Sequence, residues 1–189
     1  MKRIITGFVF LFVGLTVYSQ QIPKWKITDV QQMMKADDGI LVLNFWATFC
    51  KPCVAEIPSF IKLVEKHKKD NVKLVLISLD LPSYYPEKIA AFAIKNNFKT
   101  NISWLEETNA DYFCPKVDLS WSGSIPATLV INTKTGFRKF FEGQISGKEF
   151  EETLNAAINS TATKSSVADH STDGPNPNVL SPMQPATPN

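Results

Sequence analysis

The chain has 189 residues, which is close to the roughly 100–200 residues of a single domain. Hydrophobic residues make up 44% and charged residues 20%, a balance that is typical of soluble globular proteins and excludes a coiled coil, a collagen or a wholly disordered chain. Lys2 and Arg3 account for the net charge of +2, because the remainder holds 18 basic and 18 acidic residues. The composition therefore excludes nucleic-acid binding through a basic surface as the main function, and three cysteines are too few for a small disulfide-stabilised protein.

Residues 1–19 have the pattern of an export signal. The positive charges of Lys2 and Arg3 precede an uncharged, largely apolar run over 4–17, and Ser19 ends a plausible cleavage site before Gln20. The alternative is an uncleaved membrane anchor, although the run is shorter than the roughly 17–25 residues that span a bilayer. Both alternatives predict an exported protein of the periplasm or cell envelope.

Residues 160–189 are expected to form a disordered tail. They hold five of the twelve prolines, many Ser, Thr, Asn and Ala residues, and few large apolar side chains. Such a segment cannot bury enough surface to offset its chain entropy. A solvated tail is therefore expected, with a spacer or a partner-binding segment as the alternative. The intervening residues 20–159 are expected to form one domain with a sizeable core.

Apolar runs and helical spacings alternate through this domain. Buried strands are expected at 40–47, 72–79 and 127–131, a short strand at 102–105, and an edge strand at 137–142 that follows the turn 132–136. Helices are expected at 27–35, from 54 onward with a kink at Pro58, from Pro86 to 97, and at 147–158, while 106–124 is expected to be irregular. Parallel strands joined by helices and followed by an antiparallel hairpin predict an α/β fold, with a mixed central sheet covered on both faces.

Two cysteines directly follow the first buried strand, as Cys50-Lys51-Pro52-Cys53. Pro52 suits the opening turn of a helix, so the Cys50 sulfur is expected at a helix N-terminus, where unpaired N–H groups and the helix dipole stabilise a thiolate. Cys53 is expected one turn further on the same side. Cysteines in such motifs have pKa values of roughly 3.5–7.5 instead of about 8.5, so the pair predicts dithiol redox chemistry.

Other uses of the pair are an inert structural disulfide and half of a metal site. A structural zinc site needs two further ligands, and the histidines of the chain are His67 and His170, one among helix lysines and one in the tail. We therefore expect no metal and no cofactor beyond the redox-active Cys50–Cys53 disulfide.

The segment Leu43–Cys53 (LNFWATFCKPC) resembles the active-site segment of the thioredoxin superfamily, and in particular that of the exported TlpA/ResA-like thiol–disulfide oxidoreductases. Asn44 stands where thioredoxin has a buried Asp. Glu56 and Pro58 follow in the pattern of the TlpA/ResA-like branch, and Gly123–Thr128 matches its G-x-x-P-x-T segment. The resemblance runs from about residue 40 to 158 and implies a thioredoxin-like fold of three layers, α/β/α.

The resemblance implies that Cys50 attacks a disulfide of a partner protein and that Cys53 then resolves the mixed disulfide. It also implies a cis peptide bond before Pro126, which would lie against the cysteine pair. The backbone of Ile125 would hold the bound partner chain.

Glu56 is implied to lie near the pair and to assist its proton transfer, since the amide of Asn44 cannot accept a proton as an Asp would. The alternative for Glu56 is an exposed carboxylate on the helix. The expected catalytic residues are Cys50, Cys53, Glu56 and Pro126, and the expected substrate-binding residues are Trp46, Phe49, Lys51, Pro52, Trp121 and Ile125. Phe49 replaces the Trp that is common before the first cysteine, which is expected to alter partner binding and to leave the redox chemistry intact. Cys114 is expected to be a buried, inert thiol, with a regulatory or intermolecular thiol as the alternative.

The leading prediction is thus a thiol–disulfide oxidoreductase of the cell envelope that reduces protein disulfides. Its expected partners are disulfide-containing exported proteins, apocytochrome c among the candidates, and a membrane thiol reductant as electron donor. We expect a monomer that binds no nucleic acid. One alternative is a thiol peroxidase, for which Thr48 is present but the usual proline is absent. The other is a copper-binding module, which would need a Cys-x-x-x-Cys spacing and a distant histidine.

Overall fold

The computed structural model describes residues 21–36 and 39–160. The predicted export signal and residues 161–189 of the predicted tail lie outside the described residues. A six-stranded sheet organises the domain, with strand order β1-β4-β3-β2-β5-β6. The strands are β1 (Lys24–Trp25), β2 (Ile40–Trp46), β3 (Val72–Ser78), β4 (Asn101–Leu105), β5 (Ala127–Asn132) and β6 (Phe137–Glu142).

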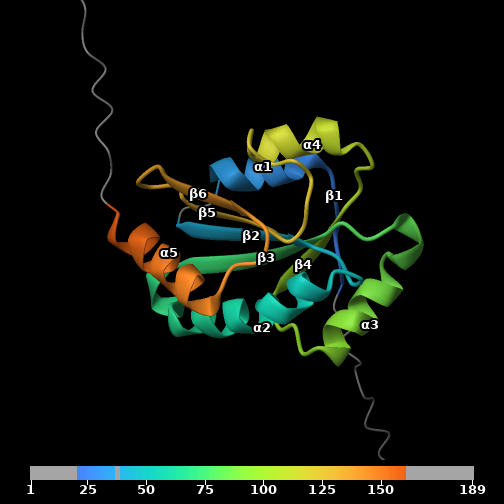
Figure 1. The fold of residues 1–189 in the computed structure, drawn as a ribbon, viewed down its shortest axis with the longest axis horizontal. Helices are drawn as coiled ribbons and strands as arrows, with labels where there is room; N and C mark the ends of the chain where they lie inside the picture. Colours follow the sequence, from blue (N-terminus) through green and yellow to red (C-terminus); the bar gives the residue numbers. More distant parts are fainter. Residues whose placement is uncertain (1–20, 37–38, 161–189) are drawn as a thin grey trace, which may run out of the picture.

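The sheet is mixed, as predicted. Strands β1, β4, β3 and β2 run parallel to one another, and β5 and β6 add an antiparallel hairpin beside β2. Helices cover both faces, which gives the predicted three layers (Figure 1). The helices are α1 (Ile27–Ala36), α2 (Lys51–Lys66), α3 (Glu87–Lys95), α4 (Ala110–Val117) and α5 (Gly147–Asn159), with short 3-10 turns at Lys68–Asp70 and Pro82–Tyr84.

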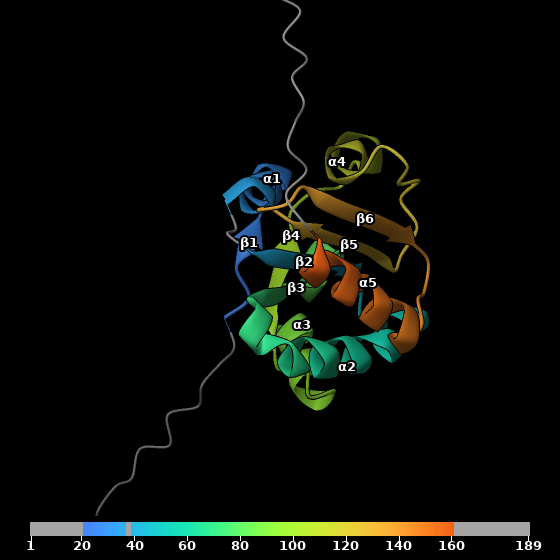
Figure 2. The same ribbon diagram turned by 90° about the vertical axis from the view of Figure 1, so that its left-hand side faces the viewer.

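Strand β2 is the centre of the core, since all seven of its residues are buried. Successive side chains of a strand point to opposite faces of the sheet. Leu41, Leu43 and Phe45 therefore pack on the side of α1 and α4, and Val42 and Trp46 pack on the side of α2, α3 and α5. Figure 2 shows the two helix groups on opposite faces of the sheet. Asn44 has the same parity as Val42, which directs a polar side chain toward α2.

Two elements were not predicted. Strand β1 has only two residues, whose pairing with Trp104 and Leu105 is a long-range contact. Helix α4 lies inside the segment 106–124 that was expected to be irregular, so that prediction was wrong. Asn109 caps this helix by accepting a hydrogen bond from the backbone N–H of Tyr112. Pro115 within eight residues masks the helical pattern in the sequence.

Prolines lie inside one helix and directly before another. Helix α2 is continuous from Lys51 to Lys66 with Pro58 inside it. Pro86 is the N-cap of α3, whose first residue is Glu87. Among the described residues no helix is both long and apolar enough to cross a membrane.

Ser160, directly after α5, is the last residue that the structure describes, and it forms hydrogen bonds with the domain. Its hydroxyl donates to the carbonyl oxygen of Ala157 at 2.7 Å and pairs with the hydroxyl of Thr135 at 2.6 Å. Ser160, the first residue of the predicted tail, is therefore hydrogen-bonded to the domain.

Candidate active site

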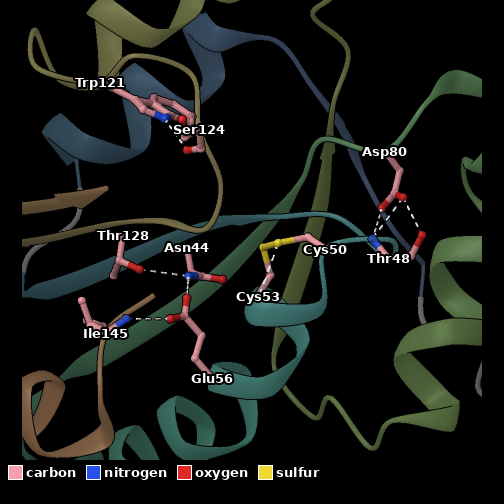
Figure 3. The surroundings of a disulfide bond; sticks show 10 residues. All are labelled: Asn44, Thr48, Cys50, Cys53, Glu56, Asp80, Trp121, Ser124, Thr128 and Ile145. Atoms are coloured by element: carbon pink, nitrogen blue, oxygen red, sulfur yellow. Dashed lines mark hydrogen bonds between the residues drawn. A yellow bond between two sulfur atoms is a disulfide. The ribbon is translucent and has the colours of Figure 1, made fainter. Parts of the chain in front are cut away.

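Cys50 lies at the junction between strand β2 and helix α2. It is the N-cap residue of α2, with extended backbone, and its sulfur accepts a hydrogen bond from the backbone N–H of Cys53 at 3.3 Å. Pro52 is in the opening turn of the helix, as predicted. Cys50 and Cys53 form a disulfide bond (Figure 3). The geometry confirms that the Cys50 sulfur sits at the positive end of the helix dipole.

The two sulfur-bearing residues differ in exposure. Cys50 is 8% exposed, whereas Cys53 is 0% exposed beneath it. Of the two, Cys50 alone retains any exposure, so a partner disulfide would meet Cys50 before Cys53. Reduction of this pair would leave one accessible thiol at a helix N-terminus and one enclosed thiol behind it, which is the arrangement of an attacking and a resolving cysteine.

Asp80, just after β3, fixes the loop that leads into Cys50. Both of its carboxylate oxygens accept from the backbone N–H of Thr48 at 3.1 Å, and Oδ1 also accepts from the Thr48 hydroxyl at 2.6 Å. The hydroxyl of Ser78 donates to Oδ2 at 2.8 Å, and the indole N–H of Trp104 donates to the Asp80 carbonyl. Asp80 is only 4% exposed. Sequence reasoning missed this residue, because the two partners are 32 positions apart and only the parallel pairing of β2 with β3 brings them together.

A second polar cluster is buried on the other side of the pair. Asn44 and Thr128 are directly opposite each other on β2 and β5. The side-chain nitrogen of Asn44 donates to the Thr128 hydroxyl and to Oε1 of Glu56, both at 2.9 Å. Oε2 of Glu56 accepts from the backbone N–H of Ile145 at 3.1 Å. These four residues come from four separate segments, as Figure 3 shows.

Glu56 is 3% exposed, which contradicts the alternative of an exposed helix carboxylate. Burial raises its pKa to about 7, while the hydrogen bonds from Ile145 and Asn44 act in the opposite direction. A carboxyl group with such a pKa exchanges protons near neutral pH. It shares the buried side of α2 with Cys53, Ile57 and Phe60. These apolar residues recur at helical spacing around position 56. Their spacing is the signal in the sequence from which the burial of Glu56 could have been inferred.

The loop before β5 holds the predicted cis-proline. The Ile125–Pro126 peptide bond is cis, as the resemblance implied. Glu142 at the end of β6 anchors this loop by accepting from the backbone N–H groups of Ser122 and Ser124 and from the Ser122 hydroxyl. The Ser122 hydroxyl and these N–H groups hold the pKa of Glu142 below its usual value. Sequence reasoning did not identify Glu142.

The predicted substrate-binding residues fall into two sets. Phe49 is 66% exposed beside Cys50, Lys51 and Pro52 are also exposed, and Ile125 is half-buried. Trp46 is 0% exposed and Trp121 is 4% exposed. Trp46 packs edge-on against Phe98, and the Trp121 indole donates to the Ser124 carbonyl. The Trp46 ring therefore belongs to the core, on the same side of the sheet as Cys50 and Cys53.

Cys114 is a free, buried thiol on α4. Burial, with smaller contributions from Glu142 and Asp111, raises its pKa to about 11. At neutral pH it is a neutral thiol, in keeping with the predicted inert role. Within residues 21–36 and 39–160 there is no group of three or more His, Cys, Asp or Glu side chains that could hold a metal ion.

Comparison with known proteins places this site in a family. The model of the AhpC/TSA family matches residues 17–138. The chain belongs to the AhpC/TSA family. A thioredoxin-like protein, YneN of Bacillus subtilis, is 29% identical over 141 residues, which cover 72% of this chain and 78% of YneN. Sporulation thiol-disulfide oxidoreductase A of the same organism is 26% identical over 167 residues, 80% of this chain and 96% of that protein.

A shorter segment of the chain matches a further relative at higher identity. The thiol-disulfide oxidoreductase ResA of Oceanobacillus iheyensis is 48% identical over 40 residues, which are 21% of each chain. The structure of a thioredoxin-related protein from Neisseria meningitidis serogroup B superposes with a TM-score of 0.53 and 26% identity, covering 67% of this chain and 87% of that one. The predicted thioredoxin-like fold and ResA-like family are confirmed. With the Cys50–Cys53 disulfide at the site, so is the predicted dithiol chemistry of a thiol–disulfide oxidoreductase.

Proposed function

We propose that the protein reduces disulfide bonds of exported proteins by dithiol exchange. The Cys50 thiolate attacks one sulfur of a partner disulfide, forming a Cys50–partner bond and releasing the second partner sulfur as a thiolate. The Cys53 thiolate then attacks Cys50, forming the Cys50–Cys53 bond and releasing the first partner sulfur. Two electrons pass from the pair to the partner, and the released thiolates take protons from water or from nearby acids.

The observation that carries this proposal is the contrast between the two cysteines. Cys50 is the N-cap residue of α2 and the more exposed of the two, and Cys53 is fully enclosed and donates its backbone N–H to the Cys50 sulfur. The N–H groups of the first helical turn stabilise a thiolate at Cys50. This favours Cys50 as the attacking sulfur and as the sulfur that carries the partner in the mixed disulfide.

Resolution requires that Cys53 lose its proton in an enclosed site, where burial disfavours the thiolate. Glu56 is the base that we assign to this step. Its burial and its pKa of about 7 allow it to take and return a proton near neutral pH. Asn44 holds Oε1 of Glu56 and the backbone N–H of Ile145 holds Oε2, so the carboxylate is fixed in place.

The partner chain is proposed to bind around Cys50 through the exposed residues that surround it. Phe49, Lys51 and Pro52 offer an apolar ring, a positive charge and a rigid turn next to the sulfur. Ile125, which packs against the same core cluster as Cys50 and Cys53, is proposed to present its backbone to the partner, next to Pro126.

We further propose that the protein acts in the periplasm or cell envelope after export directed by residues 1–19. Its partners there would be disulfide-containing exported proteins, with apocytochrome c as one candidate, and a membrane thiol reductant would return electrons to Cys50–Cys53. The near-neutral charge of the chain without Lys2 and Arg3 supports a protein that binds neither nucleic acid nor an anionic surface. A monomer is proposed as the working form.

The test is reduction of a model protein disulfide by the mature protein, with a chemical thiol as electron source. Cys50→Ala is expected to abolish reduction, Cys53→Ala to stop it at the mixed disulfide, and Cys114→Ala to leave the rate unchanged as the matched control. Reduction that survives Cys50→Ala would overturn the proposal.

A thiol peroxidase is the weaker alternative. The Thr48 hydroxyl, which would have to serve a peroxide, already donates to Asp80 at 2.6 Å. Consumption of hydrogen peroxide by the reduced protein at a rate above that of its disulfide reduction would favour that activity. Copper binding to the reduced pair, measured by titration of Cu(I), would instead favour the binding module.

A further inference from the structure

One polar atom of the buried cluster has no partner. Asn44 is 0% exposed, and its nitrogen makes two hydrogen bonds, but its side-chain oxygen Oδ1 has no hydrogen-bond partner among the described residues. An unpaired buried acceptor costs about 1–3 kcal/mol. Figure 3 shows this oxygen pointing away from Glu56 and toward Cys53. The Cys53 sulfur thus lies on the side to which this unpaired acceptor points, and a thiol there has a hydrogen to donate.

The orientation of Asn44 depends on the charge of Glu56. Oε1 of an ionised Glu56 can only accept, so it must face the NH₂ group of Asn44, as observed at 2.9 Å. Oε2 is occupied by the backbone N–H of Ile145, which can only donate. A proton arriving on Glu56 must therefore reside on Oε1, where it points at Asn44. The protonated carboxyl group would then need an acceptor in the position that the Asn44 NH₂ group now holds.

We propose that the side-chain amide of Asn44 is a two-position switch that couples the protonation of Glu56 to the ionisation of Cys53. With Glu56 ionised, the NH₂ group faces Glu56 and the oxygen faces Cys53, which favours the neutral Cys53 thiol. With Glu56 protonated, a rotation of the amide by half a turn presents its oxygen to Glu56 and its NH₂ group to Cys53. The NH₂ group then donates to the Cys53 thiolate and stabilises it.

Thr128 permits both positions. Its hydroxyl accepts from the Asn44 NH₂ group in the observed position at 2.9 Å. A hydroxyl group rotates and both donates and accepts, so it can donate to the Asn44 oxygen in the other position. The rotation thus exchanges donors for acceptors at all three contacts. It gives the Asn44 oxygen two donors, Glu56 and Thr128, and the NH₂ group one acceptor, the Cys53 thiolate.

The switch balances the proton that resolution must move. In the starting state Cys53 carries one proton and Glu56 carries none; in the end state Glu56 carries one proton on Oε1 and Cys53 is a thiolate. No electron moves in this step. The Cys53 thiolate then attacks Cys50 and resolves the mixed disulfide. This last step rests on the proposed function, whereas the rotation of the Asn44 amide does not. Asn44 acts through Glu56 and Cys53 and is a positioning residue.

The groups that face Glu56 come from every element packed around it. They are the Asn44 amide from β2, the Thr128 hydroxyl beyond it on β5, the Ile145 N–H before α5, and Cys53 on α2 itself. The pKa of Glu56 is set by its burial and by the hydrogen bonds from Ile145 and Asn44, with no charged side chain among the causes. The orientation of the Asn44 amide is therefore expected to change with the protonation of Glu56 and not with that of another side chain.

The direct test is nuclear magnetic resonance of the oxidised protein, in which neither Cys50 nor Cys53 titrates and no partner is needed. Above the pKa of Glu56, nuclear Overhauser effects are expected from the Asn44 NH₂ protons to the side chain of Thr128. Below it, these effects are expected to move to the β protons of Cys53. An NH₂ group that keeps the same neighbours on both sides of pH 7 would overturn the switch, whatever the outcome of the disulfide reduction assay.

Variants give a second, independent readout. The oxygen of Gln in Glu56→Gln must accept from the Ile145 N–H, so its NH₂ group faces Asn44 and holds the switch in the thiolate-stabilising position. In a Cys50→Ala background, thiolate absorbance is expected to show an about tenfold higher ratio of thiolate to thiol for Cys53 at fixed pH, which is about one pKa unit. With Asn44→Leu added, most of this increase is expected to vanish. An undiminished increase would show simple charge repulsion by Glu56 and would overturn the role of Asn44.

Discussion

The side-chain nitrogen of Asn44 donates to Oε1 of Glu56 at 2.9 Å, in a site from which water is nearly excluded. Position 44 lies on the central strand and position 56 on the helix that carries the cysteines. The bond therefore ties the redox helix to the sheet through a group that titrates near neutral pH. A change in the protonation of Glu56 therefore acts on a contact that joins α2 to β2.

The stability of the oxidised protein is expected to fall as pH rises from about 5 to about 8. Folded Glu56 keeps its proton up to about pH 7, whereas the unfolded chain releases it near 4.5, so the folded state binds more protons over that interval and loses stability as pH rises. The loss is at most about 3 kcal/mol. Denaturant unfolding of the wild type and of Glu56→Gln at both pH values measures it. The variant is expected to lack this part of the pH dependence, and parallel curves for the two proteins would contradict the raised pKa.

Glu56→Gln is also expected to slow resolution of the mixed disulfide. The variant stabilises the Cys53 thiolate but cannot receive its proton, so water must do so instead. A lost general base typically costs about 10²–10⁴-fold, and less where water substitutes. Stopped-flow reduction of a model disulfide separates the attack from the resolution. Asn44→Asp in the same background is expected to restore part of the rate, because it returns a carboxylate to the cluster. An unchanged rate of resolution in Glu56→Gln would show that Glu56 has only a structural role.

Asp80 is expected to support both stability and the position of Cys50. Asp80→Ala leaves the half-buried Thr48 N–H and the buried Ser78 hydroxyl without their acceptor, at a cost of about 3 kcal/mol. The matched variant Thr48→Val removes only the hydroxyl bond and is expected to cost about 1 kcal/mol. Denaturant midpoints measure both. The rate at which Cys50 attacks a model disulfide is expected to fall more in Asp80→Ala than in Thr48→Val. Equal rates would show that the hydrogen bonds from Thr48 to Asp80 do not position Cys50.

The end of the domain can be located by two truncations that differ by one residue. A chain that ends after Ser160 is expected to unfold at the same denaturant concentration as the full mature chain, since the residues beyond it offer little apolar surface. A chain that ends after Asn159 loses the Ser160 hydrogen bonds to Ala157 and Thr135 and is expected to lose about 1 kcal/mol. A lower midpoint already in the longer chain would show that the segment 161–189 contributes to stability.

The sequence predicted the parts of this structure that depend on local pattern. The apolar run of β2, the helical spacing after it, and the Cys50–Cys53 pair at their junction are all local features. The parts that it did not predict depend on contacts between distant segments. Asp80 reaches Thr48 only because β3 lies beside β2, and the two residues of β1 form a strand only because β4 pairs with them.

The burial of Glu56 is an intermediate case. Its spacing from Cys53 and Phe60 places it on the apolar face of α2, but a carboxylate on such a face is usually exposed. What allows its burial is the pair of donors from Asn44 and Ile145, which belong to β2 and to the segment before α5. Those donors are visible only in the folded protein, so the proximity of Glu56 to the pair rested on family resemblance.

The exposure of the two cysteines makes a simple chemical prediction. In the reduced protein at pH about 6–7, a limiting amount of an alkylating reagent is expected to modify Cys50 first, because it is the accessible and more acidic thiol. Cys114, whose pKa is raised to about 11, is expected to react last. Peptide mapping by mass spectrometry gives the order. Preferential labelling of Cys53 or Cys114 would contradict the assignment of the nucleophile.

The central claim is that Cys50 carries the partner and Cys53 releases it, and trapping tests it most directly. The Cys53→Ala protein is reduced, mixed with a disulfide-containing polypeptide, quenched with acid, and mapped by mass spectrometry. The account predicts a stable mixed disulfide whose bond joins the partner to Cys50, and no such adduct from the Cys50→Ala protein. A partner found on Cys114, or an adduct that forms equally well without Cys50, would contradict it.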